Sequence, residues 1–356
     1  MTMNNMKTLT AQRVSDYQCR CCGHDCYADT LWAREMMYGT RERFQYDRCA
    51  SCGSLQLRDV PEDLARFYLS DGYPCWAKVP AHILRDPPWL RRAMIAQRTD
   101  FELGRASPLG WLLRQAFGPA EFPYDWNWLR RPRLSRTDRL LDFGCGSGEL
   151  LRYLRANAFV NLCGVDPFAE PGDSRLGLQF HTALQEGWSG RFDCAMLHHS
   201  LEHVPDPLQT LRSVLECVRP DGTLLVRVPL SQSWAEREYG TDWVQLDAPR
   251  HLVLPSEKGM RRLGERLGLR LEHIDYDSTR FQFMGSEQYR LDIPMYDESR
   301  SRQPYKNSQL DDAQFTRWDT RAAELNASGD GDQASFYFRR IGASRGDHSA
   351  IAKTAD

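Results

Sequence analysis

The sequence has eleven cysteines, and four of them form two C-x-x-C-G motifs near the N-terminus: Cys19, Cys22, Cys49 and Cys52. In such a knuckle the glycine allows the turn that points backbone N–H groups at thiolate sulfur, and two knuckles supply the four sulfur ligands of tetrahedral zinc. The spacing therefore predicts a closed zinc site that supports folding and takes no part in catalysis. Cys21 and Cys26 are rivals for a ligand position, and an iron–sulfur or redox role is the alternative to zinc.

A glycine-rich turn follows an apolar run that ends in Asp142. The residues from Gly144 to Gly148 read Gly-Cys-Gly-Ser-Gly, and the chain then continues to Ala158 in a helical pattern. Glycine lets the backbone approach a ligand closely. A second carboxylate, Asp166, ends the next apolar run 24 residues after Asp142, where it can accept two hydrogen bonds from a ribose diol. This order of strand, turn, helix and strand is typical of a nucleoside-binding unit.

The spacing of the turn indicates which nucleoside is bound. A dinucleotide site uses G-x-G-x-x-G and places a pyrophosphate on the helix N-terminus, whereas this turn reads G-x-G-x-G after Asp142. A carboxylate there would repel a pyrophosphate, but it suits a cofactor that carries an ammonium and a sulfonium. A generic glycine turn of an α/β protein is the alternative.

At these residues the chain resembles the class I S-adenosylmethionine (SAM)-dependent methyltransferases, over roughly residues 138 to 275. The resemblance implies that SAM lies on the turn, with Asp166 at the ribose and Phe168 or Leu184 near the adenine. The cofactor-binding residues expected on this basis are Asp142, Gly144, Cys145, Gly146, Gly148, Asp166, Phe168, Leu184 and His198.

Apolar runs and helical patterns alternate along the rest of the chain. Further strands are expected at residues 177–182, 191–197, 223–229, 271–276 and 334–339, and helices at 207–218 and 256–267, with a polar turn at 219–222. This alternation predicts an α/β fold with a mostly parallel, Rossmann-like sheet of seven strands, covered on both faces. The resemblance adds that the final strand inserts antiparallel beside the fifth.

Polar residues follow the fourth expected strand, at the sheet edge where open α/β sheets bind their ligands. The segment His198 to Pro207 lacks the Asn/Asp-Pro-Pro-Tyr element of base-amine methyltransferases. Its wording resembles the group that includes ubiquinone O-methyltransferases and sugar-modifying enzymes. In the ubiquinone enzymes a Glu-x-x-Glu-His element accompanies a divalent cation; here His199, Glu202 and His203 stand at the matching positions. Because His replaces the first Glu, a hydrogen-bonded cluster at a helix start is the alternative that we favour.

A second histidine segment, Trp243 to Ser256, resembles one in zinc-ribbon sugar C-methyltransferases and in bacterial relatives of glycan pathways. Methyl transfer needs a base that takes the proton of the acceptor, and histidine titrates in the useful range. His251 is therefore the first choice for the general base, with Tyr239 and His199 behind it. A packing or capping role for His251 is the alternative.

The sequence divides into four regions: a zinc ribbon at 1–60, a helical linker or lid at 61–137, the SAM domain at 138–342 and a disordered tail at 343–356. An insertion at 280–333 is expected to cover the acceptor site, with Arg280, Gln282, Ser286 and Glu287 as acceptor contacts. Within the linker, Trp and Arg interleave along residues 88–98 and 107–117. Ordinary helical packing is the favoured interpretation, with a lid or peripheral membrane contact as alternatives. Five arginines follow between residues 130 and 139, as a solvated linker or as contacts to substrate phosphates.

Charge and composition reduce the number of functional classes that fit this sequence. The chain has 356 residues, a net charge of −2 and 41% hydrophobic residues, which suit one α/β core with a small module and argue against a nucleic-acid footprint. Without an apolar run of membrane-spanning length or a signal core, a soluble cytoplasmic protein is expected. The expected activity is methyl transfer to a small molecule, foremost a sugar hydroxyl or carbon in a nucleotide sugar or glycan. A zinc-containing RNA methyltransferase and a catalytically silent SAM-binding scaffold are the alternatives.

Overall fold

The computed structural model describes residues 12–13, 17–68, 79–169, 178–296 and 312–342. The tail expected at 343–356 lies outside these residues. In the described part of the chain, no helix combines the length and the apolar character needed to cross a membrane.

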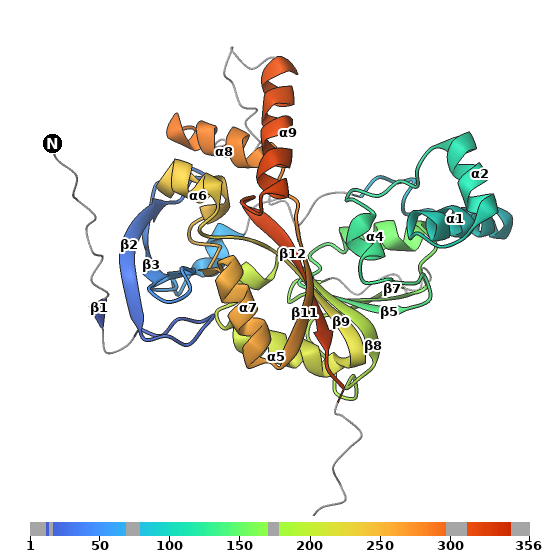
Figure 1. Cartoon of the computed structure of the whole chain (residues 1–356), viewed down its shortest axis with the longest axis horizontal. Coiled ribbons are helices and arrows are strands. Elements are labelled where there is room, and N and C mark those ends of the chain that lie inside the picture. The colour runs from blue at the N-terminus through green and yellow to red at the C-terminus, as the bar shows by residue number, and fades with distance from the viewer. Residues whose placement is uncertain (1–11, 14–16, 69–78, 170–177, 297–311, 343–356) are drawn as a thin grey trace, which may run out of the picture.

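A seven-stranded sheet forms the centre of the molecule (Figure 1), with the order β11-β12-β9-β8-β5-β6-β7. Its strands are β5 (Arg139–Phe143), β6 (Asn161–Val165), β7 (Leu178–His181), β8 (Phe192–His198), β9 (Val218–Pro229), β11 (Leu269–Tyr276) and β12 (Gln333–Arg340). The strands from β5 to β9 run parallel, whereas β12 pairs antiparallel with both β9 and β11. The Rossmann-like architecture expected from the sequence, including the antiparallel final strand beside the fifth, is therefore confirmed.

One expected turn lies inside a strand. Residues 219–222 belong to β9, where the pairing with β8 jumps from Phe192–Val218 to Cys194–Thr223. Asp221 takes a φ of 60° at this point. The polar segment thus forms an irregularity within the strand. The turn predicted there was wrong, because composition alone does not distinguish such an irregularity from a turn that ends a strand.

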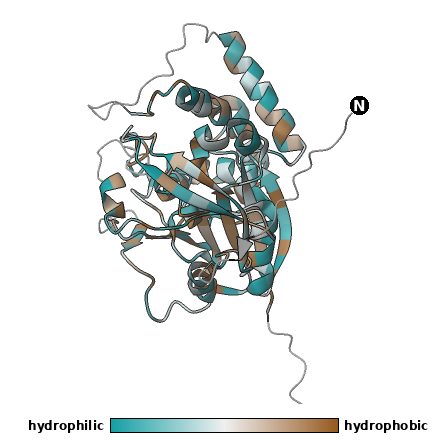
Figure 2. Ribbon diagram, turned by 90° about the vertical axis from the view of Figure 1, so that its left-hand side faces the viewer, coloured by the Kyte–Doolittle hydropathy of each residue, from teal (hydrophilic) through white to brown (hydrophobic). Residues whose placement is uncertain are grey.

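Helices cover the two faces of the sheet, and local signals fix where they begin. They include α4 (Glu149–Ala156), α5 (Pro207–Cys217) and α7 (Glu257–Arg266). The Asp206 side chain accepts a hydrogen bond from the backbone N–H of Gln209, and Ser256 accepts one from that of Gly259, so both act as N-caps. Hydrophobic segments gather in the strands at the centre of the molecule (Figure 2), where burial of apolar surface stabilises the fold.

The N-terminal ribbon forms a second sheet with the order β1-β2-β3-β4-β10. Its strands are β1 (Gln12–Arg13), β2 (Cys26–Arg34), β3 (Arg43–Cys49), β4 (Leu55–Leu57) and β10 (Val253–Leu254). The last of these comes from the SAM domain and pairs antiparallel with β4, Val253 opposite Gln56. The ribbon sheet therefore extends beyond residue 60 and is continuous with the segment that carries His251.

The linker region contains η1 (Leu64–Phe67), α1 (Trp89–Glu102), α2 (Pro108–Phe117) and α3 (Asn127–Arg130). Helices α1 and α2 contact each other and project from the body at the end beside α4 (Figure 1). Some of the arginines that follow are structural: Arg136 forms two hydrogen bonds with Asp100, and Arg130 donates to the carbonyl of Glu102. These two arginines thus tie α1 to the segment that precedes β5.

The remaining helices surround the histidine segments. They are η4 (Leu201–His203), α6 (Trp234–Tyr239), η5 (Gly240–Asp242), η6 (Val244–Leu246), α8 (Phe281–Arg290) and α9 (Asp312–Ala327). Helix α8 packs on α6, η5 and η6. The expected insertion at 280–333 therefore contributes α8 and α9, while its residues 297–311 lie outside the described part of the chain.

Candidate active site and metal site

The glycine turn connects β5 to α4. At two of its glycines, Gly144 and Gly148, there is no room for a larger side chain. Gly144, Gly146 and Gly148 all have positive φ, at 78°, 52° and 76°. A Cβ atom on Gly144 would lie 2.3 Å from the Cβ of Ser200, and one on Gly148 would lie 2.3 Å from the ring of Phe180. Glycine is required at both positions because conformation and space exclude other residues.

Two carboxylates flank this turn. Asp166, after β6, accepts hydrogen bonds from the backbone N–H groups of Gly146 at 3.0 Å and Phe168 at 2.9 Å. Asp142 is buried, and its Oδ1 has no hydrogen-bond partner among the described residues. Burial, followed by the nearby charge of Asp166, raises the pKa of Asp142 to about 7. A bound cation would stabilise the ionised form of this carboxyl group.

The other expected cofactor contacts lie along the same sheet edge. Phe168 follows Asp166 and exposes 59% of its surface, so its ring is accessible to a base that stacks on it. Leu184 follows β7 and is half-buried, as is Cys145 in the turn itself. His198 ends β8, and its buried Nδ1 has no partner among the described residues. Buried polar atoms normally find a partner, so Asp142 and His198 fit a polar ligand such as SAM.

The four motif cysteines converge on one point of the ribbon. The Sγ atoms of Cys19 and Cys52 are 3.6 Å apart, those of Cys22 and Cys49 are 3.5 Å apart, and all four lie within 4.8 Å of one another. With Zn–S bonds of about 2.3 Å, the edge of a tetrahedral site is about 3.8 Å. The sulfur geometry therefore fits a tetrahedral zinc ion.

Local backbone geometry also fits a zinc knuckle. The N–H groups of Ser51 and Cys52 both point at the Cys49 sulfur, at 3.4 Å. The rival cysteines lie outside the four-sulfur cluster: Cys21 is fully buried, and Cys26 contacts Asp25. The structure thus brings together the four residues that the motif spacing predicts.

Arg227 links the ends of three strands beside the glycine turn. Its Nε donates to Asp277 at 2.5 Å, and its Nη1 contacts the Nε2 atoms of His198, at 3.3 Å, and His199. Since a guanidinium can only donate, both imidazole nitrogens must accept. Burial, followed by the charge of Arg227, lowers the pKa of both histidines. The neutral form of both imidazoles is therefore favoured.

Aromatic side chains from the linker cover His198. The ring of Tyr124 lies 4.5 Å from that of His198, and the ring of Trp128 lies 5.0 Å from it. The guanidinium of Arg227 lies 5.9 Å from the Tyr124 ring centre. Part of the linker region therefore covers the end of β8.

The general-base candidate His251 lies beside His203 and Glu202. The two imidazole rings are 4.8 Å apart. His251 Nδ1 lies 2.7 Å from the carbonyl of Gln245, and His203 Nδ1 lies 3.0 Å from that of Arg250. Because a carbonyl only accepts, each Nδ1 carries the proton and each Nε2 keeps a lone pair.

Glu202 completes this group. Its carboxylate is fully buried, and Oε2 has no partner among the described residues. Burial alone would raise the pKa of Glu202, but the hydrogen bond from His199 and the neighbouring imidazoles lower it to about 2. Burial and His251 lower the pKa of His203 to about 4. Ligand atoms of Glu202, His203 and His251 lie within 4.8 Å of one another, so the group that converges contains His251 in place of the expected His199.

Charged residues behind His251 hold its segment in place. Arg250 is fully buried and donates to Asp247 at 2.6 Å and to Glu35 of the ribbon at 3.0 Å. The hydroxyl of Tyr46, also from the ribbon, donates to the carbonyl of His251 at 2.8 Å. The sheet of the N-terminal ribbon therefore supports the candidate base directly.

The third base candidate, Tyr239, lies elsewhere. Its hydroxyl donates to Glu287 of α8 at 3.1 Å, and the Arg290 guanidinium lies 4.2 Å from its ring centre. Burial, followed by the charge of Glu287, raises the pKa of Tyr239, which disfavours the phenolate that a base would need. The geometry thus favours His251 over Tyr239.

The expected acceptor contacts of α8 are mostly engaged within the protein. Arg280 pairs with Asp319 at 3.0 Å, and Ser286 bonds to Val244 and Gln282. Gln282 is buried, with no partner for Oε1 among the described residues. Of this set, only Gln282 has a buried side-chain atom without a hydrogen-bond partner among the described residues.

Sequence reasoning missed Arg227, Tyr124 and Trp128. Arg227 had a visible signal, because it is a charged residue inside the apolar strand Thr223 to Pro229. A charge in a buried strand needs a partner and often marks a functional site. The two aromatic residues had no such signal, since only the fold brings them to His198.

Comparison with known proteins bears on the central domain. Residues 123–274 match a family model described as a methyltransferase domain. Two similar curated proteins are named ubiquinone biosynthesis O-methyltransferase. That of Aromatoleum aromaticum is 33% identical over 112 residues, which cover 28% of this chain and 47% of that protein. That of Aeromonas salmonicida is 29% identical over 153 residues, covering 37% and 62%. The chain spans about half the length of the curated relatives it matches.

Two solved structures are similar in fold. One is a chain from the complex of the Haloferax volcanii Trm112 methyltransferase activator, with 19% identity, a TM-score of 0.41 and coverage of 61% of this chain and 88% of that one. The other is a SAM-dependent methyltransferase from Mesorhizobium loti, with 18% identity, a TM-score of 0.36 and coverage of 60% and 97%. The domain match and the curated relatives support a SAM-dependent methyltransferase.

Proposed function

We propose that the protein is a SAM-dependent methyltransferase that acts on a hydroxyl or carbon of a small molecule, with a sugar of a nucleotide sugar or glycan as the foremost acceptor class. The observation that carries the proposal is the arrangement at one sheet edge. Asp142 and Asp166 flank a glycine turn, and the imidazole of His251 lies beside Glu202, with its Nε2 3.8 Å from Oδ2 of Asp247. Methyl transfer needs a methyl donor and a proton acceptor at one site.

SAM supplies an electrophilic methyl group when it is bound, and the chain supplies the rest. Asp166 would hold the ribose diol of SAM, and the carboxylate of Asp142 would balance the positive charge of the cofactor. His251 takes the proton of the acceptor at Nε2, while the bond from Nδ1 to Gln245 fixes the ring and its tautomer. Glu202 lies close enough to stabilise the imidazolium that forms.

The relatives named ubiquinone O-methyltransferases favour a second acceptor class, an aromatic ring hydroxyl. Both classes use the same base, because either hydroxyl must lose its proton. Release of S-adenosylhomocysteine from a panel of nucleotide sugars and catechols would distinguish them. Turnover of any member of the panel would also argue against a silent scaffold.

Replacing His251 by Ala is expected to lower kcat by about 100-fold or more, because general-base catalysis contributes this much. The affinity for SAM, measured by calorimetry, is expected to stay unchanged, since His251 is assigned to the acceptor. His273→Ala serves as the matched control, because His273 is half-exposed on β11 and pairs with Asp275. Near-full turnover of the His251 variant would disprove its role as the base.

The four-cysteine cluster is proposed to hold one structural zinc ion. The cluster lies in the ribbon. Its sulfur atoms contact one another, and the Cys49 sulfur also accepts from the backbone N–H of Cys52. A site closed by four thiolates has no open position for a substrate. Its contribution is therefore to the folding of the ribbon, and through the ribbon to the placement of His251.

A further inference from the structure

Helices α1 and α2 expose a cluster of large apolar side chains. In the described part of the chain, six of the thirteen exposed large hydrophobic residues belong to these two helices, and we call them the hairpin patch: Trp89, Leu90, Leu109, Trp111, Leu112 and Phe117. Their exposed fractions run from 51% to 80%. The ordinary helical packing favoured from the sequence accounts for Leu113 and Gly110, which are buried, but not for the patch.

The six residues of the hairpin patch belong to two helices that contact each other. Single exposed hydrophobic side chains are normal, whereas several large ones on one small unit indicate an interaction surface. Three of the six are aromatic, and two of these are tryptophans, the residue enriched where a protein meets the headgroup layer of a bilayer. The patch is therefore a candidate contact with an interface that is apolar on one side and polar on the other.

The charges of the same two helices and their connecting loop decide which partner fits. Residues 89–117 contain five arginines and two acidic residues, in a chain whose net charge is −2. Both acidic residues are neutralised, Asp100 by Arg136 and Glu102 by Arg114. A second copy of the chain would bring one positive surface against another, and that contact is unfavourable. Anionic lipid headgroups complement the exposed arginines, Arg91 and Arg105, which contribute to binding at the membrane surface.

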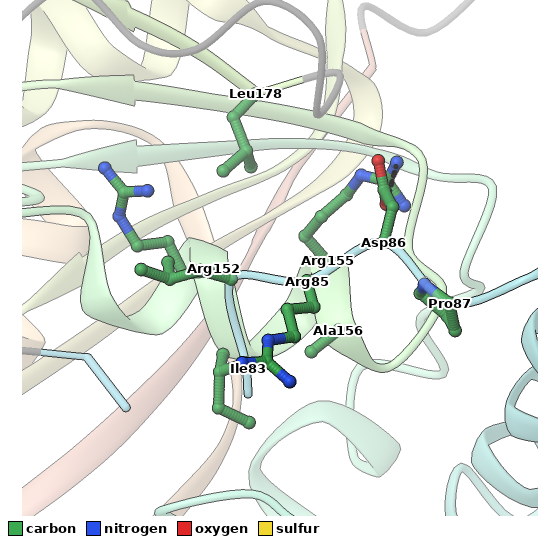
Figure 3. Close-up of a pocket in the computed structure, with 9 residues that line it drawn as sticks. Ile83, Arg85, Asp86, Pro87, Arg152, Arg155, Ala156 and Leu178 are labelled. Carbon is green, nitrogen blue, oxygen red and sulfur yellow. Dashed lines mark hydrogen bonds and ion pairs between the residues drawn. The ribbon is translucent and has the colours of Figure 1, made fainter. Parts of the chain in front are cut away.

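The hairpin is held in a fixed orientation at its base. Asp86 accepts from Arg155 of α4 at 3.1 Å and from Arg92 of α1 at 3.4 Å, and Figure 3 shows Asp86 beside Arg155. The space around these side chains has room for no more than a water molecule. At the other end of α1, Asp100 pairs with Arg136. The patch is therefore preformed and needs no rearrangement to meet a surface.

We propose that the hairpin patch is a docking surface for an anionic lipid bilayer. The aromatic and leucine side chains enter the headgroup region, and Arg91 and Arg105, which are exposed, contact lipid phosphates. The chain continues from α2 to Tyr124 and Trp128, which cover His198. Docking would thus hold the cover of the active site close to the membrane, where an acceptor carried by a lipid would be found.

Sedimentation with vesicles tests this proposal on the full chain. The protein is mixed with vesicles of phosphatidylcholine alone or of phosphatidylcholine with phosphatidylglycerol. We expect binding to the anionic vesicles only, weakened as salt rises, since the arginine contacts are screened. The double variant Trp111→Ala/Phe117→Ala is expected to bind about ten-fold more weakly, because it removes apolar surface from the interface.

Trp32→Ala provides the matched control, because Trp32 is 50% exposed on β2, away from the hairpin. It is expected to bind like the wild type, and circular dichroism verifies that all variants are folded. Absence of binding to anionic vesicles, or equal loss in the Trp32 variant, would overturn the proposal. So would a concentration-dependent dimer that the double variant abolishes, because the patch would then be a contact between copies. The vesicle assay does not depend on methyl transfer, so its result is independent of the proposed function.

Discussion

At the glycine turn, the residue that favours ligand binding also lowers the stability of the ligand-free protein. Asp142 is buried without a hydrogen-bond partner for Oδ1 among the described residues, an arrangement that costs free energy in the protein alone. Its value lies in the complex, where a cation replaces the water that the carboxylate has lost. The pKa raised to about 7 shows the same conflict, since the folded protein without ligand favours the neutral acid near neutral pH.

Asp142→Asn is therefore expected to stabilise the ligand-free protein and to weaken SAM binding. Between about pH 4 and 7 the folded wild type holds the Asp142 proton that the unfolded chain has lost, so its stability falls as pH rises. Asn has no such titration. The difference in unfolding free energy between variant and wild type should therefore grow over this range, to about 4 kcal/mol.

Urea unfolding at several pH values measures this difference, and calorimetry with SAM measures the loss of affinity. Asp59→Asn is the control, because Asp59 is exposed and should show neither effect. If the stability of the Asp142→Asn variant followed that of the wild type at every pH, the buried carboxyl group would not be responsible.

At the level of elements, how well the sequence predicted the fold depended on how local each signal was. The strands around Asp142, Asp166 and His198 are continuous apolar runs, and each was predicted near its observed position. Strand β10 has only two residues, Val253–Leu254, and its pairing with β4 joins segments about 200 residues apart. No local pattern encodes such a contact, because the partner strand supplies half of the hydrogen bonds.

The same limit applies to the site. The four-cysteine cluster could be predicted from the spacing of the two C-x-x-C-G motifs, since each pair of cysteines lies within one turn of chain. The sequence did not predict that His251, in place of His199, lies in the group with Glu202 and His203. It depends on the segment after β9 folding back over η4, where the N–H of Leu252 donates to the carbonyl of Glu202 at 2.7 Å.

The buried ion pairs between ribbon and SAM domain lead to a prediction at this scale. Glu35 is fully buried and accepts from Arg250 and from the N–H groups of Tyr38 and Thr40. Glu35→Gln places an amide NH2 group among these donors and removes a negative charge that balances Arg250. This change should lower the free energy of unfolding by about 3 kcal/mol. Chemical denaturation measures this loss.

Glu42→Gln is the matched control on the same ribbon. Its carboxylate pairs with Arg66 in a partly exposed position, where an ion pair contributes about 0 to 1 kcal/mol. Equal effects of the two substitutions would mean that burial of the Arg250 group does not matter to stability. Retention of zinc by both variants would show that the metal site itself is intact.

For the whole molecule, the two sheets are joined closely enough to behave as one cooperative unit. Strand β10 belongs to the ribbon sheet and to the SAM domain at once. Around the two C-x-x-C-G turns, Ser256 donates to the carbonyl of Cys52 at 2.5 Å, and Arg266 donates to that of Cys21 at 2.8 Å. These contacts lead from the two turns to the start and end of α7.

Loss of zinc is therefore expected to destabilise the SAM domain as well as the ribbon. In a thermal ramp of the wild type, release of zinc to a colorimetric chelator should coincide with loss of the circular dichroism of the sheet and of SAM binding. The variant Cys49→Ser/Cys52→Ser should lack about one zinc per chain and melt roughly 10 °C lower, because metal binding contributes several kcal/mol to folding. Cys26→Ser, outside the four-sulfur cluster, should retain both the zinc and the melting temperature. A ramp in which zinc leaves well before SAM binding is lost would instead show that the ribbon unfolds alone, and the support of His251 by Tyr46 and Arg250 would then be dispensable for the domain.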